Sequence, residues 1–185
     1  MRRRAKREGG EIFWGDETGV QNECNYTRGY SPRGKTPVTK LSHNNKYRVN
    51  LVSAISNNGK LRFSLYEDNM TQQKLKIFCN RLIKTIGHKV FLILDNLKVH
   101  HSRLFKKWIA DNRDKIEVFY LPSYSPERNP DEYFNGALKR EIEKHGDCKS
   151  KKEFFENARR AAYTIQNNKQ KLISFFKAEK IAFAA

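Results

Sequence analysis

The amino-acid sequence predicts an α/β fold in which helices flank a mixed β-sheet. Residues 47–56 and 61–65 alternate between apolar and polar side chains, which is typical of strands with one face in a core. The apolar run Val90–Leu94 is typical of a strand that is buried on both faces. Segments with helical spacing lie between and after these strands. The expected order is therefore three strands, a helix, a strand, a helix, a strand and then further helices.

The first three predicted strands form an antiparallel meander. The first is the short apolar segment Glu11–Trp14, which we expect to end at Gly15 and Asp16. Between the second and third strands lies Asn58-Gly59, a pair that adopts the positive φ angles of a tight hairpin turn. The strands on either side of this turn are therefore expected to pair antiparallel.

The predicted helices have apolar residues spaced three and four positions apart. One helix begins near Thr71 and ends at Gly87, a residue suited to the left-handed position after a helix. A second helix precedes a short strand at Ile116–Leu121, and the chain after Asn129 is helical. The apolar faces are formed by Leu75, Phe78, Cys79, Leu82, Ile83 and Ile86 in the first helix, by Leu104, Phe105, Trp108 and Ile109 in the second, by Phe134, Ala137, Leu138 and Ile142 in the third, and by Phe154, Ala158, Ala161 and Ile165 in the fourth.

The composition predicts a single globular domain with a basic surface. The 185 residues are enough to bury a core, and 12 Phe, 8 Tyr and 2 Trp are more aromatic residues than disordered chains carry. Lys and Arg number 37 against 20 Asp and Glu, and the formal charge of +17 favours nucleic acid as a partner. A surface that serves solubility or binds anionic lipid stays the alternative. Residues 149–180 carry nine Lys or Arg and three Glu, which we interpret as a solvated helix face rather than a dedicated DNA-binding surface.

Neither a disulfide framework nor a zinc site is predicted. Cys24, Cys79 and Cys148 lie far apart, are odd in number and form no C-x-x-C pair. We expect a reducing compartment, the cytoplasm, with association to the nucleoid through DNA. The basic residues 1–10 are not followed by an apolar stretch and are expected to form an N-terminal arm, either a solvated tail or a phosphate contact. No segment is long and apolar enough for a membrane span.

Carboxylates are expected to meet at one end of the predicted sheet. Asp16 and Asp95 follow two central strands, and Asp131 and Glu132 begin the helix after the last strand. Several carboxylates at the ends of buried strands are costly and raise one another's pKa unless cations lie among them. Oxygen ligands without Cys or paired His suit Mg²⁺ or Mn²⁺, and two such ions can promote displacement at a phosphodiester.

The segment Leu121–Phe134 also has a purely structural interpretation. Asn129 can cap the following helix, and Pro130 suits its first position. Asp131 and Glu132 complement the helix dipole, and Glu132 stands where a capping box has a Glu. Taken alone, this pattern would indicate only the start of a helix.

Three motifs together carry a family resemblance. WGDETG at Trp14–Gly19, ILDNLKVHHS at Ile93–Ser102 and LPSYSPERNPDE at Leu121–Glu132 resemble the catalytic core of DDE transposases in the mariner superfamily, nearest to its bacterial insertion sequence 630 branch. The resemblance covers residues 10–165 and implies a ribonuclease H-like fold, which agrees with the order of elements predicted above. It also implies a transposase that hydrolyses phosphodiester bonds at the ends of an element in double-stranded DNA. The free 3′-OH is then joined to TA target sites in cut-and-paste movement.

The resemblance implies that Asp16, Asp95 and Glu132 are the catalytic acids and hold two Mg²⁺ or Mn²⁺ ions. The 36 residues between Asp95 and Glu132 agree with the family's spacing in the mid-thirties. Asp131 stays the alternative third acid, because some relatives use Asp there. Adjacent residues of a helix point about 100° apart, so only one of the two faces the site.

Other residues near the motifs have weaker assignments. His100 matches a histidine of the family and either contacts DNA or orders the site, while a core or surface role stays open. Lys98 and Arg128 are further candidates for DNA contact. Arg128 stands where relatives often carry an apolar residue, which is either an extra phosphate contact or without consequence. Glu17 is expected to point to the other side of its strand from Asp16.

The resemblance leaves one domain of the family unaccounted for. Full-length relatives carry helix-turn-helix domains ahead of the catalytic core, and here only residues 1–10 precede the first strand. We expect residues 11–185 to form the catalytic domain, with a helix-turn-helix subunit encoded separately or by a frameshifted fusion, or the gene to be a remnant. A homodimer is expected by family analogy, because two element ends are handled together. The alternatives are a catalytically silent DNA-binding remnant or regulator, and a ribonuclease H-like nuclease acting on RNA–DNA hybrids.

Overall fold

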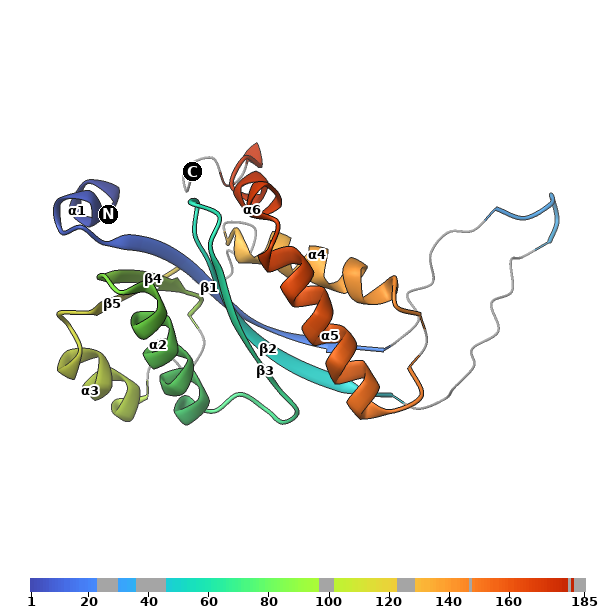
Figure 1. Cartoon of the computed structure of the whole chain (residues 1–185), viewed down its shortest axis with the longest axis horizontal. Helices are drawn as coiled ribbons and strands as arrows, with labels where there is room; N and C mark the ends of the chain where they lie inside the picture. Colours follow the sequence, from blue (N-terminus) through green and yellow to red (C-terminus); the bar gives the residue numbers. More distant parts are fainter. Residues whose placement is uncertain are drawn as a thin grey trace.

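A computed structural model of the chain describes residues 1–22, 30–35, 46–96, 102–122, 129–146, 148–179 and 181. Within these residues, one sheet has the strand order β3-β2-β1-β4-β5. The pairs β1–β2 and β2–β3 are antiparallel, whereas β1–β4 and β4–β5 are parallel. The predicted mixed α/β fold is confirmed (Figure 1). The strands are β1 (Glu11–Gln21), β2 (Arg48–Ile55), β3 (Leu61–Tyr66), β4 (Val90–Leu94) and β5 (Ile116–Tyr120), and the helices are α1 (Arg2–Arg7), α2 (Gln72–Ile86), α3 (Arg103–Asp111), α4 (Asp131–Glu143), α5 (Lys151–Gln166) and α6 (Lys169–Phe175).

Helices cover both faces of the sheet, with α2 and α3 on one face and α4, α5 and α6 on the other (Figure 1). The buried side chains form two clusters, one in each layer. Phe13 and Leu92 belong to the cluster under α2 and α3, whereas their neighbours Trp14 and Ile93 belong to the cluster under α4 and α5. Successive strand residues point to opposite faces, so a strand covered on both sides is apolar throughout, as β4 is.

Strand β1 is longer than expected. It continues past Trp14 to Gln21, because residues Trp14–Gln21 pair with β2. Gly15 therefore lies inside the strand and does not end it. A Cβ atom on Gly15 would lie 2.9 Å from Leu94 Cδ2 and 3.1 Å from the Ser53 carbonyl oxygen, so the glycine permits a close approach of the neighbouring strands. Asp16 consequently occupies a mid-strand position.

The predicted turns are confirmed, and one apolar position is not. Gly59 has a φ of 76° in the hairpin between β2 and β3, and Gly87 has a φ of 74° at the end of α2. The N-terminus of α2 is capped by Thr71, whose hydroxyl accepts a hydrogen bond from the Lys74 N–H. Leu104 was expected in the core but is 59% exposed, because Phe105 and Trp108 supply the buried face of α3. None of the described helices is long and apolar enough to cross a membrane.

The basic N-terminal residues are attached to the sheet through α1. Ala5 is buried, and the Arg4 guanidinium donates two hydrogen bonds to the Glu117 carboxylate on β5. Arg4 also pairs with Glu8, and Lys89 pairs with the same Glu8. At least one charge of this segment is thus used in contacts within the protein.

A second polar cluster lies at the start of β1, away from Asp16. Glu11 is 5% exposed. Its carboxylate accepts hydrogen bonds from Ser56 Oγ, Asn58 Nδ2 and Lys60 Nζ. Burial would raise the pKa of Glu11, but these donors hold it below its usual value. The cluster ties the hairpin between β2 and β3 to β1.

Candidate active site

Asp16 lies on the α4 side of β1 and is 8% exposed. It points to the same face as Trp14, two residues earlier, whose cluster packs under α4. Its Oδ1 accepts a 2.8 Å hydrogen bond from the Glu17 backbone N–H, and its Oδ2 accepts a 2.9 Å bond from Asn135 Nδ2. Glu17 acts electrostatically on Cys79 of α2, which is consistent with the expectation that it points to the opposite face.

Asp95 follows the last residue of β4 and lies beside Asp16. Strands β1 and β4 pair in parallel from Glu11↔Val90 to Trp14↔Ile93. Asp16 and Asp95 each stand two residues beyond that last pair, so they take equivalent positions on adjacent segments. The negative charge of Asp95 is one of the interactions that raise the pKa of Asp16.

The start of α4 is attached to β1 by Asn129. Its Nδ2 donates a hydrogen bond to the Gly15 carbonyl oxygen, and its Oδ1 accepts one from the Asp131 N–H. The helix begins at Asp131, and Pro130 takes the N-cap position without a side-chain cap bond. The expected boundary was therefore one residue too early. Because Asn129 contacts both β1 and the first turn of α4, it fixes the acids of that turn relative to Asp16.

Asp131 and Glu132 point in different directions. Asp131 is fully buried, and its Oδ2 accepts a 2.6 Å hydrogen bond from Ser53 Oγ on β2. Glu132 is exposed, and its side chain lies within hydrogen-bonding reach of Asp16. Among the two candidates for the third acid, Glu132 is therefore the one that adjoins both Asp16 and solvent.

The acids perturb one another strongly. Burial, followed by the charge of Glu132 and then that of Asp95, raises the pKa of Asp16 to about 7, although the Glu17 N–H opposes the shift. Burial and the nearby Asp16 raise the pKa of Asp131 well above its usual value, against the hydrogen bond from Ser53. Asp16 therefore exchanges its proton near neutral pH.

The donor chemistry fits a hard divalent cation. Asp16, Asp95 and Glu132 offer only carboxylate oxygens, and their mutual repulsion is what a bound cation would relieve. The side chains as they stand do not converge on one cation: the described residues contain no group of three His, Cys, Asp or Glu arranged to hold a metal. Asp16 and Glu132 instead meet as a pair, so coordination requires rotation of these side chains.

Some predicted residues cannot be compared with the structure, and others were missed. Lys98, His100 and Arg128 lie outside the described residues. Asn135, which contacts Asp16, was not predicted. A signal was present, since it is a polar residue three positions after Glu132 within an otherwise apolar helical stripe.

Comparison with known proteins identifies the family of the chain. The DDE superfamily endonuclease family matches residues 11–155, and the chain belongs to this family. It is 25% identical over 158 residues to an uncharacterized 39 kDa protein of insertion element IS630 from Shigella sonnei, covering 83% of this chain. The chain spans only 45% of the length of that relative.

Solved structures share the fold at low sequence identity. The Mos1 transposase in its paired-end complex with the left transposon end has a TM-score of 0.56 at 17% identity, covering 93% of this chain and 57% of that one. The HTLV-2 integrase catalytic core domain in complex with magnesium, in a dimeric form, has a TM-score of 0.51 at 17% identity, covering 83% of each chain. The predicted ribonuclease H-like fold and the resemblance to DDE transposases of the insertion sequence 630 and mariner type are confirmed.

Proposed function

We propose that this chain is the catalytic domain of a DNA transposase, with residues 1–10 as a basic arm and residues 11–185 as the catalytic unit. It hydrolyses phosphodiester bonds at element ends and transfers the freed 3′-OH into target DNA in the presence of Mg²⁺ or Mn²⁺. The observation that carries the proposal is the placement of three acids at one end of the sheet: Asp16 in β1, Asp95 at the equivalent position after β4, and Glu132 in the first turn of α4, the last two close enough to raise the pKa of Asp16. The sequence singles out the same three.

Each residue of the site has a distinct role in this proposal. Asp16, Asp95 and Glu132 would hold the two cations, which when bound supply Lewis-acid activation of the attacking and leaving oxygens. Asn135 orients Asp16 through the bond to its Oδ2, and each carboxylate oxygen, with one lone pair used by Asn135 or the Glu17 N–H, has a second lone pair for coordination. Asn129 and Ser53 hold the first turn of α4 against the sheet.

Nicking of supercoiled plasmid DNA tests this function. Wild type, Asp95→Asn and Glu132→Gln are purified identically and incubated with Mg²⁺, with Mn²⁺ or with EDTA. Glu67→Gln is the matched control, because Glu67 is an exposed acid that pairs with Lys151. We expect metal-dependent nicking in the wild type and the control and none in the two site variants. Equal nicking by all four proteins would contradict the proposal and indicate a contaminating nuclease.

Two further assays separate the alternative functions. Faster cleavage of an RNA–DNA hybrid than of duplex DNA would favour a ribonuclease H-like nuclease. Salt-dependent DNA binding without any response to metal would favour a silent regulator.

The partners proposed for the working complex are double-stranded DNA, a second copy of the chain and a separate helix-turn-helix subunit. The Mos1 and HTLV-2 structures support the first two by likeness, since one contains a transposon end and the other is dimeric. Association with the nucleoid would follow from the charge of +17.

A further inference from the structure

The outward surface of α2 and α3 carries a dense group of basic side chains. The two helices lie in the layer opposite α4 and pack against each other (Figure 1). Together they contain seven Lys or Arg and one acid, Asp111, and α2 has no acid at all. We call this surface the basic α2–α3 face and define it by Lys76, Arg81, Lys84, Arg103, Lys106 and Lys107.

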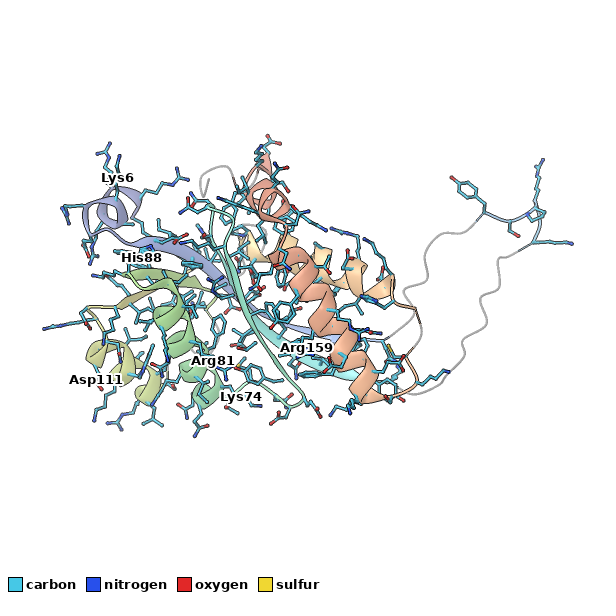
Figure 2. The ribbon with its side chains drawn as sticks, in the orientation of Figure 1. Lys6, Lys74, Arg81, His88, Asp111 and Arg159 are labelled. Carbon is cyan, nitrogen blue, oxygen red and sulfur yellow. The ribbon has the colours of Figure 1, made fainter. Side chains whose placement is uncertain are left out.

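Five of these six side chains are exposed, and none of the six forms an ion pair with a carboxylate in the part of the chain that the structure describes. Lys76 is the partly buried member. Among the described residues, Lys74 is the basic residue of α2 that forms an ion pair, with Asp68. Figure 2 shows Arg81 beside α2, on the side of that helix away from α3 in this view, and Asp111 at the end of α3.

One charge of this face, Arg103, is placed where it opposes helix stability, whereas Lys84 lies in the last turn of α2, where a cation is favourable. Neither α2 nor α3 has an acid in its first turn, and Arg103 is the first residue of α3. Cations at a helix N-terminus are unfavourable because they face the positive end of the dipole. The other long helices follow the opposite pattern, with Asp131 and Glu132 opening α4 and Glu153 opening α5. A bound polyanion would relieve this repulsion.

The direction of the helices connects this face to the candidate active site. Strands β3 and β4 both run parallel to β1, and α2 follows β3 as α3 follows β4. Both helices therefore begin at the end of the sheet where Asp95 lies and run away from it. The 15 residues of α2 span about 22 Å, which is about six base pairs of DNA.

We propose that the basic α2–α3 face binds the phosphate backbone of duplex DNA that continues from the carboxylate site, as a docking surface separate from the catalytic acids. The proposal rests on the proposed function for the identity of the polyanion. A second copy of this chain is disfavoured as the occupant, because two such faces would repel. Ile77 and Leu104 are 48% and 59% exposed, but they stand among these charges rather than in an apolar groove.

Two triple variants with the same change in charge test the proposal. The first is Arg81→Gln, Lys84→Gln and Lys107→Gln, which removes three charges from the basic α2–α3 face. The control is Lys152→Gln, Arg160→Gln and Lys177→Gln, which removes three exposed charges from α5 and the segment after α6. Both are made in the Asp95→Asn background, and binding to a labelled 30-base-pair duplex is measured in EDTA across a salt series. Circular dichroism confirms that both fold.

The expected result differs between the triples. The first should weaken binding by about tenfold or more and reduce the slope of log K against log salt by about two to three, because each lost phosphate contact contributes about 0.9. The control should change the slope by less than about one. Equal losses in both triples, or none in either, would overturn the proposal. So would competition by vesicles of phosphatidylserine and phosphatidylcholine that matches competition by unlabelled duplex.

The outcome is separable from that of the proposed function. Binding in EDTA needs no cleavage, so a wild type that nicks DNA while the first triple binds normally would remove the docking surface and leave the transposase. If the first triple loses binding while the wild type never nicks DNA, the docking surface is supported and the transposase function is contradicted.

Discussion

Asn135 Nδ2 donates a 2.9 Å hydrogen bond to Oδ2 of Asp16, and Asn135 is itself only 3% exposed. This bond joins the inner face of α4 to the middle of β1 and selects the orientation of a carboxylate that would otherwise rotate. The other carboxylate oxygen of Asp16, Oδ1, accepts a hydrogen bond from the Glu17 backbone N–H. Asn135 is therefore a positioning residue for the first acid of the site.

Replacing Asn135 by Ala should reduce metal-dependent nicking by about 10- to 100-fold, the usual effect of losing a residue that orients a metal ligand. The metal concentration for half-maximal rate should rise as well. Asn157→Ala is the matched control, because Asn157 is also a buried helical Asn but bonds to Cys148 Sγ instead. Equal loss of activity in both variants would mean that stability, and not the orientation of Asp16, is responsible.

The two neighbouring acids of α4 should respond differently to neutral replacement. Glu132→Gln should lower nicking by more than about 100-fold, a larger loss than is usual for a residue that only orients a metal ligand. Asp131→Asn should keep most activity, because burial already favours the neutral form and Asn retains an acceptor for Ser53. Asp131→Ala should lower the free energy of unfolding by about 1–3 kcal/mol, because the Ser53 hydroxyl loses its partner. Nicking rates and urea unfolding are measured for the same protein samples. Loss of nicking in Asp131→Asn with activity kept in Glu132→Gln would make Asp131 the third acid.

Without metal, the stability contribution of Asp16 should decline as pH rises. Its folded pKa of about 7 lies above the ordinary value of 3.8, so the folded state holds the extra proton between these values. The free energy of unfolding therefore falls as pH increases through this window. Asp16→Asn removes the effect and should gain stability relative to wild type, by up to about 4 kcal/mol near pH 8. Urea titrations of both proteins in EDTA from pH 5 to pH 8 measure it, and parallel curves would contradict the assignment.

Divalent cations should stabilise the folded protein through the three acids. Mg²⁺ or Mn²⁺ at about 100 times its dissociation constant adds about 2.7 kcal/mol. This corresponds to a rise in Tm of about 5 °C or more for a domain of this size. Differential scanning calorimetry should detect the rise in wild type and not in Asp95→Asn, with Ca²⁺-free buffer and EDTA as references. A similar rise in the variant would place the cation elsewhere.

The Glu11 cluster should matter for stability and not for the reaction. Glu11→Ala leaves Lys60, Ser56 and Asn58 without their common acceptor, which should cost about 1–3 kcal/mol, a range that allows for the partial exposure of Lys60. The contribution is present above the ordinary pKa of 4.5 and is lost as pH falls below it, because the folded pKa is lowered. Chemical unfolding at pH 7 checks the loss, and the nicking rate below the unfolding transition should be unchanged.

Local sequence patterns predicted much of the fold and part of the site. The apolar run of β4, the Asn58-Gly59 turn and the helical stripe ending at Gly87 each depend on nearby residues, and each was predicted. The continuation of β1 beyond Gly15 was not, because it depends on pairing with β2, which lies far along the chain. The Asn135 contact escaped prediction for the same reason.

The arrangement of charge also depends on three-dimensional neighbours. In the sequence, the basic residues of α2 and α3 are separated by β4, and the basic helical stretch noted there was 149–180. Only the packing of α2 beside α3 brings the two groups of side chains to one surface.

Gly15 has a consequence for how this site can change through mutation. A Cβ at this position would press on Leu94, the residue immediately before Asp95, from a strand that also carries Asp16. Adding one methyl group there would require the Leu94 side chain to move or the strands to shift, so the change would act beside Asp95 and Asp16 although it touches neither carboxylate. The close packing of the strands beside the acids thus depends on the absence of a side chain at position 15.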